Sequence, residues 1–178
     1  MTKTEPTGRY ASSPCMAHDF AFDGSGPLAA DPGQARDVAR WRVSRRAELL
    51  AARRALSPDT RRAAAENIAG HVRAVLDQRF QGAVGRVLSA YWPIKAEPDL
   101  RGLMTALHAS GVRIALPLVE TRAAPLVFRC WTPGMAMVRG QWNIPVPPPE
   151  AEQVVPDISL APVMGWDACG YRLGYGGG

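Results

Sequence analysis

The chain contains few of the residues that build metal sites and disulfide frameworks, with three cysteines and three histidines among 178 residues. The cysteines are Cys15, Cys130 and Cys169, and the histidines are His18, His71 and His108. The cysteines are odd in number and widely spaced, so we expect free thiols and no zinc site or disulfide framework. The histidines lack the spacing of metal ligands or of a nucleophile with its base, which argues against both roles.

Long apolar runs and the common nucleotide motifs are also missing. No run approaches the roughly 20 residues that a membrane-spanning helix needs, and the first residues lack the basic and then apolar pattern of a secretory signal. We therefore expect a cytoplasmic protein with no membrane partner. The glycines form neither a Walker loop, which needs Gly-Lys-Ser/Thr, nor a dinucleotide fingerprint, which needs a following helix and an acidic residue.

Positive charge gathers in one segment of a chain whose net charge is +5. Nine arginines lie between Arg36 and Arg62, against only Asp37, Glu48 and Asp59. Such a cluster suits nucleic acid or a phosphorylated small molecule, although it could equally be a solvated helix face. The cluster lacks the interleaved aromatic residues and motifs of nucleic-acid-binding proteins, so we expect no nucleic-acid partner.

Composition and periodicity predict one α/β domain after an extension. Residues 1–35 are rich in Pro, Gly and Ser and should form a flexible N-terminal extension, followed by a single domain over 36–178. Helices are predicted over 34–55, 58–80 and 98–111. Strands are predicted over 86–92, 112–116, 126–131 and 158–161. The strand, helix and strand over 86–116 form a right-handed βαβ unit, so we expect a mostly parallel sheet.

Local signals refine these elements. Ser57 and Pro58 suit the N-cap and first residue of the second helix, and Gly111 suits the end of the third. The second helix should bury a stripe of Ala64, Ile68, Val72, Val75, Leu76 and Phe80. The third should bury Leu100, Leu103, Met104 and Leu107. Pro117 should end the second strand, and the proline-rich segment 145–149 cannot be a central strand or a helix.

The C-terminal segment has the composition of a phosphate site. Residues 170–178 read Gly-Tyr-Arg-Leu-Gly-Tyr-Gly-Gly-Gly. Glycine has no Cβ, so backbone N–H groups can gather around an anion, and Arg172 adds a planar fork that fits two phosphate oxygens. Because α/β sheets bind ligands beyond the carboxyl ends of their strands, we expect the site near 92–97, Pro117 and 162–178.

Four motifs stand in order along the chain. They are Arg42-x-x-x-Arg46 with Arg54-Ala55-Leu56-Ser57, then 92–97, then Gln141-Trp142-Asn143-Ile144-Pro145, then 170–178. With them the segment from Arg42 to Gly178 resembles the 5-formyltetrahydrofolate cyclo-ligase family, also called 5,10-methenyltetrahydrofolate synthetases. The Arg-Leu-Gly-x-Gly-x-Gly tail is the most specific of the four.

The resemblance implies a three-layer α/β/α, Rossmann-like enzyme with a mostly parallel sheet, a ligase that forms a cyclic C–N bond. It implies that ATP and Mg²⁺ drive the conversion of 5-formyltetrahydrofolate to 5,10-methenyltetrahydrofolate, ADP and phosphate. The formyl oxygen would be phosphorylated first, N10 would attack the activated carbon, and phosphate would leave as the ring closes. Catalysis of this kind depends on positioning and charge neutralisation.

The resemblance also implies roles for individual residues. Arg42 and Arg46 match a basic pair that contacts ATP phosphates, although the family usually has lysine at the first position. The ATP loop matches Arg172, the expected catalytic residue, together with Leu173, Gly174, Tyr175, Gly176, Gly177 and Gly178. The positions that contact folate match Trp92, Glu97, Trp142 and Tyr175. No residue of this chain is matched to a metal ligand.

Each role has a simpler alternative. The basic pair could lie on a solvated helix face, and the two tryptophans could be core residues. Glu97 could be the N-cap of the third helix or serve both purposes. Asp99 and Asp167 are interpreted as turn or cap residues rather than ligands.

In the family the glycine loop continues into Gly-Tyr-Tyr-Asp and a final segment, whose aspartate is expected to help bind Mg²⁺. This chain ends at Gly178, so we expect a C-terminally truncated domain of weak or no activity. Two other functions stay open, a folate- and ATP-binding remnant without turnover and a basic nucleic-acid-binding protein. We expect a monomer whose partners are small molecules.

Overall fold

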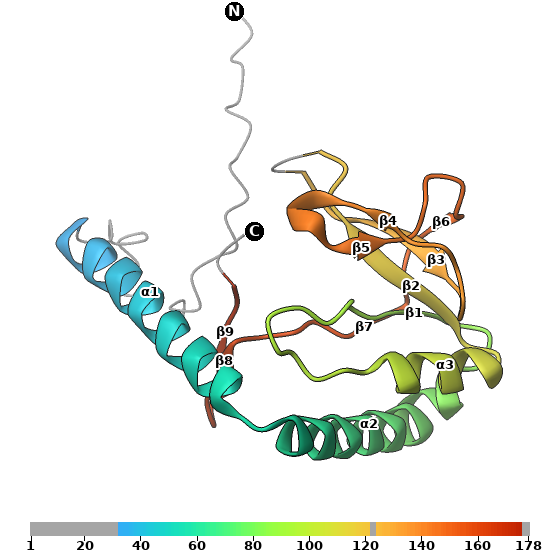
Figure 1. Cartoon of the computed structure of the whole chain (residues 1–178), viewed down its shortest axis with the longest axis horizontal. Coiled ribbons are helices and arrows are strands. Elements are labelled where there is room, and N and C mark those ends of the chain that lie inside the picture. The colour runs from blue at the N-terminus through green and yellow to red at the C-terminus, as the bar shows by residue number, and fades with distance from the viewer. Residues whose placement is uncertain (1–31, 122–123, 176–178) are drawn as a thin grey trace, which may run out of the picture. The chain divides into compact units, whose positions relative to one another are not determined.

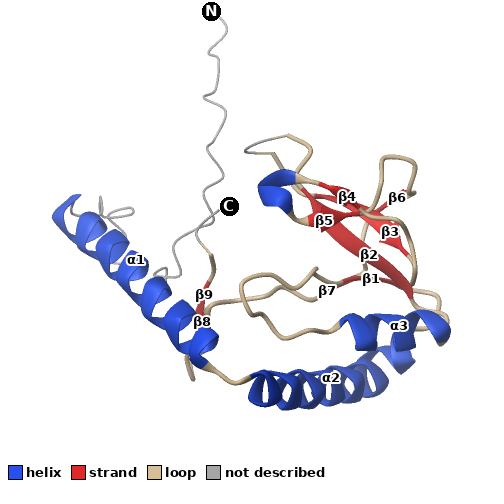
Figure 2. Ribbon diagram, viewed as in Figure 1, coloured by secondary structure: helices blue, strands red, loops and turns tan. Residues whose placement is uncertain are grey.

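The computed structural model describes residues 32–121 and 124–175, shown in Figures 1 and 2. They form two compact parts, which are described separately. The central part is Leu50–Pro162, and the terminal part joins the residues up to Leu49 with those from Val163 onward. Residues 1–31 of the predicted extension lie outside the described residues, and 32–35 belong to a helix. None of the described helices combines the length and apolar character needed to span a bilayer.

The central part is built on a five-stranded sheet with the order β6-β3-β2-β1-β7. Its strands are β1 (Val87–Ser89), β2 (Arg113–Leu118), β3 (Val127–Trp131), β6 (Gln153–Val154) and β7 (Ile158–Ser159). β1 pairs in parallel with β2 and β7, whereas β3 pairs antiparallel with β2 and β6. The sheet therefore has the expected parallel strands around β1 and is extended by antiparallel pairing beyond β2.

The predicted βαβ unit is confirmed, because helix α3 (Arg101–Ala109) connects the parallel strands β1 and β2. The expected apolar face of α3 is also confirmed, since Leu100, Leu103, Met104 and Leu107 are buried. Gly111 follows the helix with a φ of +93°, a left-handed conformation that glycine adopts without steric cost.

Helix α2 (Pro58–Phe80) begins at the predicted cap, where the Thr60 N–H donates to Ser57 Oγ at 3.1 Å. It is followed by the short 3₁₀ turn η1 (Gln81–Ala83). The predicted buried stripe is partly wrong, because Ile68 and Val75 are exposed. The side that faces the core carries Ala65, Ala69, Val72, Leu76 and Phe80. Their spacing of three or four follows one row of the helix, whereas the predicted stripe mixed two adjacent rows.

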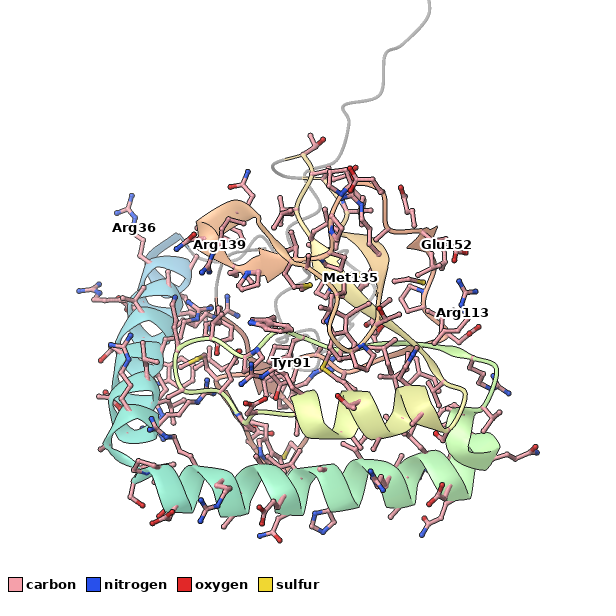
Figure 3. The ribbon with its side chains drawn as sticks, turned by 45° about the vertical axis from the view of Figure 1, so that its right-hand side comes forward. Arg36, Tyr91, Arg113, Met135, Arg139 and Glu152 are labelled. Carbon is pink, nitrogen blue, oxygen red and sulfur yellow. The ribbon has the colours of Figure 1, made fainter. Side chains whose placement is uncertain are left out.

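The core of the central part lies where α2 and α3 meet the sheet. In Figures 1 and 3, α3 lies between α2 and strands β1 and β2. The most deeply buried side chains include Leu88, Met104, Val112, Ile114 and Leu116. These come from β1, α3 and β2 and the turn between them, so the βαβ unit is the framework on which the loop after β1 is held.

Strand β2 runs through Pro117 to Leu118, although the sequence predicts that Pro117 ends it. The N–H of Arg113 and the carbonyl of Ala115 both bond toward the β1 side. Pro117 is the next residue whose backbone faces the β1 side, but the pairing with β1 has already ended there. Its missing N–H therefore costs no ladder hydrogen bond, and the strand tolerates the proline.

A second, two-stranded sheet in the central part joins β4 (Val138–Arg139) and β5 (Pro145–Val146) through the 3₁₀ turn η2 (Gln141–Asn143). The proline-rich segment 145–149 thus stays out of the five-stranded sheet, as predicted. Gly140 is closely packed here, because a Cβ at this residue would lie 3.0 Å from a Val146 methyl group.

The terminal part consists of helix α1 (Pro32–Ala55), which continues into the central part, and a hairpin of β8 (Gly165–Trp166) and β9 (Arg172–Leu173). The helix covers the predicted range 34–55. The hairpin lies directly against α1, since a Cβ on Gly165 would come within 2.8 Å of Leu49 Cδ1.

Candidate active site

The loop that follows β1 carries Trp92 and Glu97, two of the predicted folate contacts. β1 ends at Ser89, earlier than the predicted residue 92, so Trp92 belongs to this loop rather than to the strand. The Tyr91 hydroxyl, labelled in Figure 3, donates to the Pro98 carbonyl at 2.9 Å and ties the loop to itself. The loop thus occupies the edge where parallel strands of α/β sheets present ligand-binding residues.

Glu97 is 7% exposed and is held in a tight turn. Its N–H donates to the Ile94 carbonyl at 2.9 Å, and its Oε2 accepts from the Ile94 N–H at 2.8 Å. The two residues between them, Lys95 and Ala96, have φ values of 48° and 60°, the pattern of a type I′ turn that normally contains Asn and Gly. A residue with a side chain costs about 1–2 kcal/mol in this left-handed backbone conformation. Strain of this kind is found most often at functional sites.

Glu97 is not the N-cap of α3, which corrects one of the alternatives. The helix follows Leu100, which has no capping side chain. The Arg101 N–H instead donates to Asp99 Oδ1 at 3.0 Å. The prediction that Asp99 is a turn or cap residue is thereby confirmed, and the Glu97 carboxylate bonds back to the turn that precedes it.

Trp92 is half-buried and packs beside the core of the central part. The guanidinium carbon of Arg101 lies over its ring, 5.3 Å from the centroid, within the range of cation–π attraction. The core alternative therefore describes part of this side chain, and the rest of the indole is accessible.

Trp142 is 71% exposed, so the alternative that it is a core residue is wrong. It lies at the tip of the β4–β5 hairpin with φ 53°, and the next residue, Asn143, has φ 60°. This conformation is common for Asn and rare for a bulky aromatic residue. Arg139, labelled in Figure 3, donates from Nη1 to the Asn143 carbonyl at 3.0 Å and fastens the turn. The hairpin therefore holds an indole in water in a strained conformation, which core packing does not explain.

Arg46 joins the first and last motifs within the terminal part. Its Nε donates to the Gly174 carbonyl at 2.7 Å, across 128 residues of sequence. Arg42 lies one helical turn earlier on the same side of α1, and both arginines are half-buried. A fully solvated helix face therefore does not describe this pair.

The acidic residues near these arginines are paired with other arginines. The ion pairs are Arg40–Asp37 at 2.7 Å, Arg45–Glu48 at 2.8 Å and Arg62–Asp59 at 2.9 Å. Hydrogen bonds from Arg45 and Ser44 hold the pKa of Glu48 below its usual value. Within 32–121 and 124–175, no carboxylate forms an ion pair with Arg42, Arg46 or Arg172.

Arg172 begins β9 and pairs across the hairpin with Trp166. Asp167 closes the turn between them, because its Oδ1 accepts hydrogen bonds from the N–H groups of Cys169 and Tyr171, both at 2.9 Å. The prediction that Asp167 is a turn residue is confirmed. The carboxylate fixes the backbone that presents the Arg172 side chain.

The rest of the predicted ATP loop is described only in part. The Leu173 carbonyl accepts from the Met164 N–H at 2.8 Å, and Gly174 and Tyr175 follow it half-buried. Gly176, Gly177 and Gly178 lie outside the described residues.

Sequence reasoning missed Arg101, which contacts both Trp92 and Asp99. One signal was present in the sequence, because an arginine in the first turn of a helix faces the positive end of the helix dipole. Such a placement calls for a compensating anion or another favourable contact. Asp99 provides the anion, and the Trp92 ring provides the second contact.

The structure therefore groups the predicted residues in two sets. Arg46 and Gly174 are hydrogen-bonded in the terminal part, and Arg42 lies one helical turn from Arg46 on α1. Trp92 and Glu97 share one loop of the central part, and Trp142 lies on a hairpin of that part. Across the described ranges, no three His, Cys, Asp or Glu side chains are grouped so that they could hold a metal ion.

Fold and site together define a mixed α/β protein in which a loop with a buried carboxylate follows the central parallel strand and an arginine of α1 bonds to the glycine-rich segment. The model of the 5-formyltetrahydrofolate cyclo-ligase family matches residues 38–178, and the chain belongs to this family. The resemblance drawn from the four motifs is confirmed.

Several relatives are similar to the chain. The 5-formyltetrahydrofolate cyclo-ligase of Mycolicibacterium smegmatis is 34% identical over 102 residues, which cover 53% of this chain and 52% of that protein. The chain thus spans about half the length of this curated relative. The NMR structure of Aquifex aeolicus 5,10-methenyltetrahydrofolate synthetase is 27% identical with a TM-score of 0.63, covering 77% of this chain and 68% of that one. A Mycoplasma pneumoniae 5,10-methenyltetrahydrofolate synthetase, 20% identical with a TM-score of 0.56 and covering 76% and 71%, shares the fold.

Proposed function

We propose that the chain catalyses the ATP-dependent conversion of 5-formyltetrahydrofolate to 5,10-methenyltetrahydrofolate, with release of ADP and phosphate. Family membership and the name of the curated relative support this reaction. The observation that carries the proposal is the 2.7 Å hydrogen bond between Arg46 and Gly174, because it joins the two motifs that the resemblance relates to ATP.

The nucleotide would bind at the terminal part, where the charges fit a triphosphate. Arg42 and Arg46 share a helix face, and no described carboxylate pairs with them. Arg46 uses Nε for Gly174, and the Nη groups of a guanidinium can still donate to phosphate oxygens. Mg²⁺ fits as an ion held mainly by the nucleotide, since it usually keeps several waters and binds phosphates with one or two carboxylates. When bound it would neutralise charge on the β- and γ-phosphates.

The folate would bind at the central part. The carboxylate of Glu97 is fixed by the Ile94 N–H, and a carboxylate offers about four acceptor positions, so it can also accept from the paired N–H groups of a pterin. The exposed indole of Trp142 and the accessible part of Trp92 offer flat surfaces to the ring system. The resemblance implies Tyr175 as a further folate contact.

The proposed reaction would have two stages, phosphorylation of the formyl oxygen and ring closure. The formyl oxygen attacks the γ-phosphorus, a bond forms between them, and ADP leaves with the electrons of the broken P–O bond. N10 then attacks the formyl carbon and loses its proton, and phosphate leaves with the original formyl oxygen as the ring closes. The arginines Arg42, Arg46 and Arg172 would offset the negative charge of the phosphates, and the pterin contacts would hold the formyl group in line.

The test is spectroscopic, because the methenyl product absorbs in the near ultraviolet and the substrate does not share that band. Purified chain, together with any residues that its gene encodes beyond Gly178, is mixed with 5-formyltetrahydrofolate, ATP and Mg²⁺. We expect an absorbance rise that requires all three reactants. No rise with saturating substrates, in protein that calorimetry shows to bind both, would instead identify a binding remnant.

A further inference from the structure

Arg101 forms a small network at the start of α3 that no motif of the family resemblance includes. Its guanidinium carbon lies 5.3 Å from the centroid of the Trp92 ring. The same guanidinium is clamped by Asp99, with Nε 2.9 and 3.1 Å from the two carboxylate oxygens and Nη2 2.6 Å from Oδ2. One side chain thus connects a carboxylate two residues earlier with an aromatic ring nine residues earlier.

The clamp restrains a side chain that would otherwise be mobile. The side chains of Arg101 and Asp99 are 51% and 46% exposed, and a lone surface ion pair of this kind is worth little. Here the carboxylate also accepts from the Arg101 N–H at 3.0 Å, so both ends of the arginine are tied to one group. These hydrogen bonds hold the pKa of Asp99 below its usual value and raise that of Arg101.

Helix formation does not account for an arginine at this place. A cation in the first turn faces the positive end of the helix dipole, which is unfavourable. The helix has no acidic residue in its first turn, so Asp99, just before it, provides the compensating charge. What the arginine contributes in return is its contact with the indole.

We propose that Arg101 is a positioning residue for the folate, which acts by fixing the indole plane of Trp92. This inference rests on the proposed function, because it takes Trp92 as a folate contact. Trp92 packs against the core on part of its surface and carries the guanidinium on one face. The ring is thereby held in one orientation before the substrate arrives, and that preorganisation lowers the cost of binding.

The test measures substrate affinity by calorimetry, so it does not depend on turnover. Arg101→Ala should weaken binding of 5-formyltetrahydrofolate about two- to fivefold, the fold-change that corresponds to an exposed cation–π contact of ~0.5–1 kcal/mol. The affinity for ATP should not change. Arg101→Lys should restore part of the loss, because an ammonium can occupy the same face. Arg73→Ala, at an exposed position of α2, is the control and should change neither affinity.

A second readout observes the ring itself. In protein labelled with 5-fluorotryptophan, the five tryptophans give five fluorine resonances, and Trp92→Phe identifies the one from Trp92. That resonance should shift in Arg101→Ala more than any other and partly return in Arg101→Lys. In a Trp92→Ala background, Arg101→Ala should produce no further loss of folate affinity.

The outcomes separate this proposal from the proposed reaction. Unchanged folate affinity in Arg101→Ala, where Trp92→Ala weakens it, overturns the role of Arg101 and leaves the reaction standing. Equal losses for folate and ATP would reveal a merely structural effect and would also overturn it. If the wild-type chain binds folate without turnover, the reaction fails while the affinity series still decides the role of Arg101. If the wild-type chain binds no folate, both the proposed reaction and the role of Arg101 are contradicted.

Discussion

At the scale of single residues, the most informative feature is the left-handed backbone of Trp142. Turn rules favour Asn or Gly at such a position, so nothing in the local sequence predicts that a tryptophan would occupy it. An exposed aromatic side chain held in a strained conformation is expected where the side chain contacts a ligand rather than the core. The structure therefore favours the ligand role that the sequence left open.

Two substitutions at Trp142 should separate folding from binding. Both Trp142→Gly and Trp142→Ala remove the indole, so each should lose the same affinity for 5-formyltetrahydrofolate, about two- to tenfold for an aromatic stacking contact. The glycine variant should be more stable than the alanine variant by about 0.5–1 kcal/mol, because glycine accepts φ 53° without strain and alanine does not. Urea unfolding measures the second difference. If the alanine variant is as stable as the glycine variant, the turn is not strained.

Arg172 tests the phosphate site. Arg172→Ala should lower kcat/KM about ten- to hundredfold, since a hydrogen bond to a charged group is worth about 1.5–3 kcal/mol. The free energy of unfolding should change by less than about 0.5 kcal/mol, because the side chain is exposed. Arg73→Ala is the matched control, and similar small effects at both positions would show that the site does not require Arg172.

Asp99 should make the stability of the folded chain depend on pH. Its pKa is lowered from 3.8 chiefly by hydrogen bonds from Arg101, so the carboxylate stabilises the folded state above its ordinary pKa. That contribution is lost as the pH falls through the lowered value. Asp99→Asn should therefore be less stable than wild type at neutral pH, by under about 1 kcal/mol for an exposed pair. The difference should disappear in acid, as followed by urea unfolding across the pH range. A difference that persists there would come from packing rather than charge.

At the scale of elements, the turn of the β8–β9 hairpin is stabilised by one carboxylate. Asp167 accepts two backbone hydrogen bonds in the turn that precedes Arg172. Asp167→Ala should free those N–H groups, loosen the hairpin and weaken ATP binding, with little effect on folate affinity. Asp167→Asn keeps an acceptor and should retain most of the affinity. Calorimetry with each ligand provides the measurement. If Asp167→Ala binds ATP as tightly as Asp167→Asn and wild type do, the turn is held by other contacts.

Helices and the βαβ unit were predictable because their signals are local. Ser57 and Pro58 mark the start of α2, and the apolar spacing of Leu100, Leu103 and Leu107 marks the buried face of α3. The row of α2 that faces the core was harder to predict, since two neighbouring rows are both apolar. β2 can extend through Pro117 because its pairing with β1 has already ended at that point. The local sequence does not indicate where that pairing ends.

At the scale of the whole molecule, family membership could be predicted from four motifs, whereas their arrangement in space could not. The hydrogen bond between Arg46 and Gly174 spans 128 residues, and periodicity does not reveal contacts at that separation. The role of Glu97 was misjudged in one alternative because Pro98 and Asp99 resemble the start of a helix, while the helix follows Leu100. The Arg101 network escaped notice because it joins residues from a loop and a helix.

The central claim, that phosphorylation of the formyl oxygen drives ring closure, is tested most directly by the fate of that oxygen. 5-Formyltetrahydrofolate carrying oxygen-18 in the formyl group is converted with ATP and Mg²⁺, and the released phosphate is analysed by mass spectrometry. We predict one labelled oxygen in each phosphate, formed in equal amount with ADP and the methenyl product. Unlabelled phosphate alongside methenyl product would contradict the proposed mechanism, because the formyl oxygen would then have left by another route.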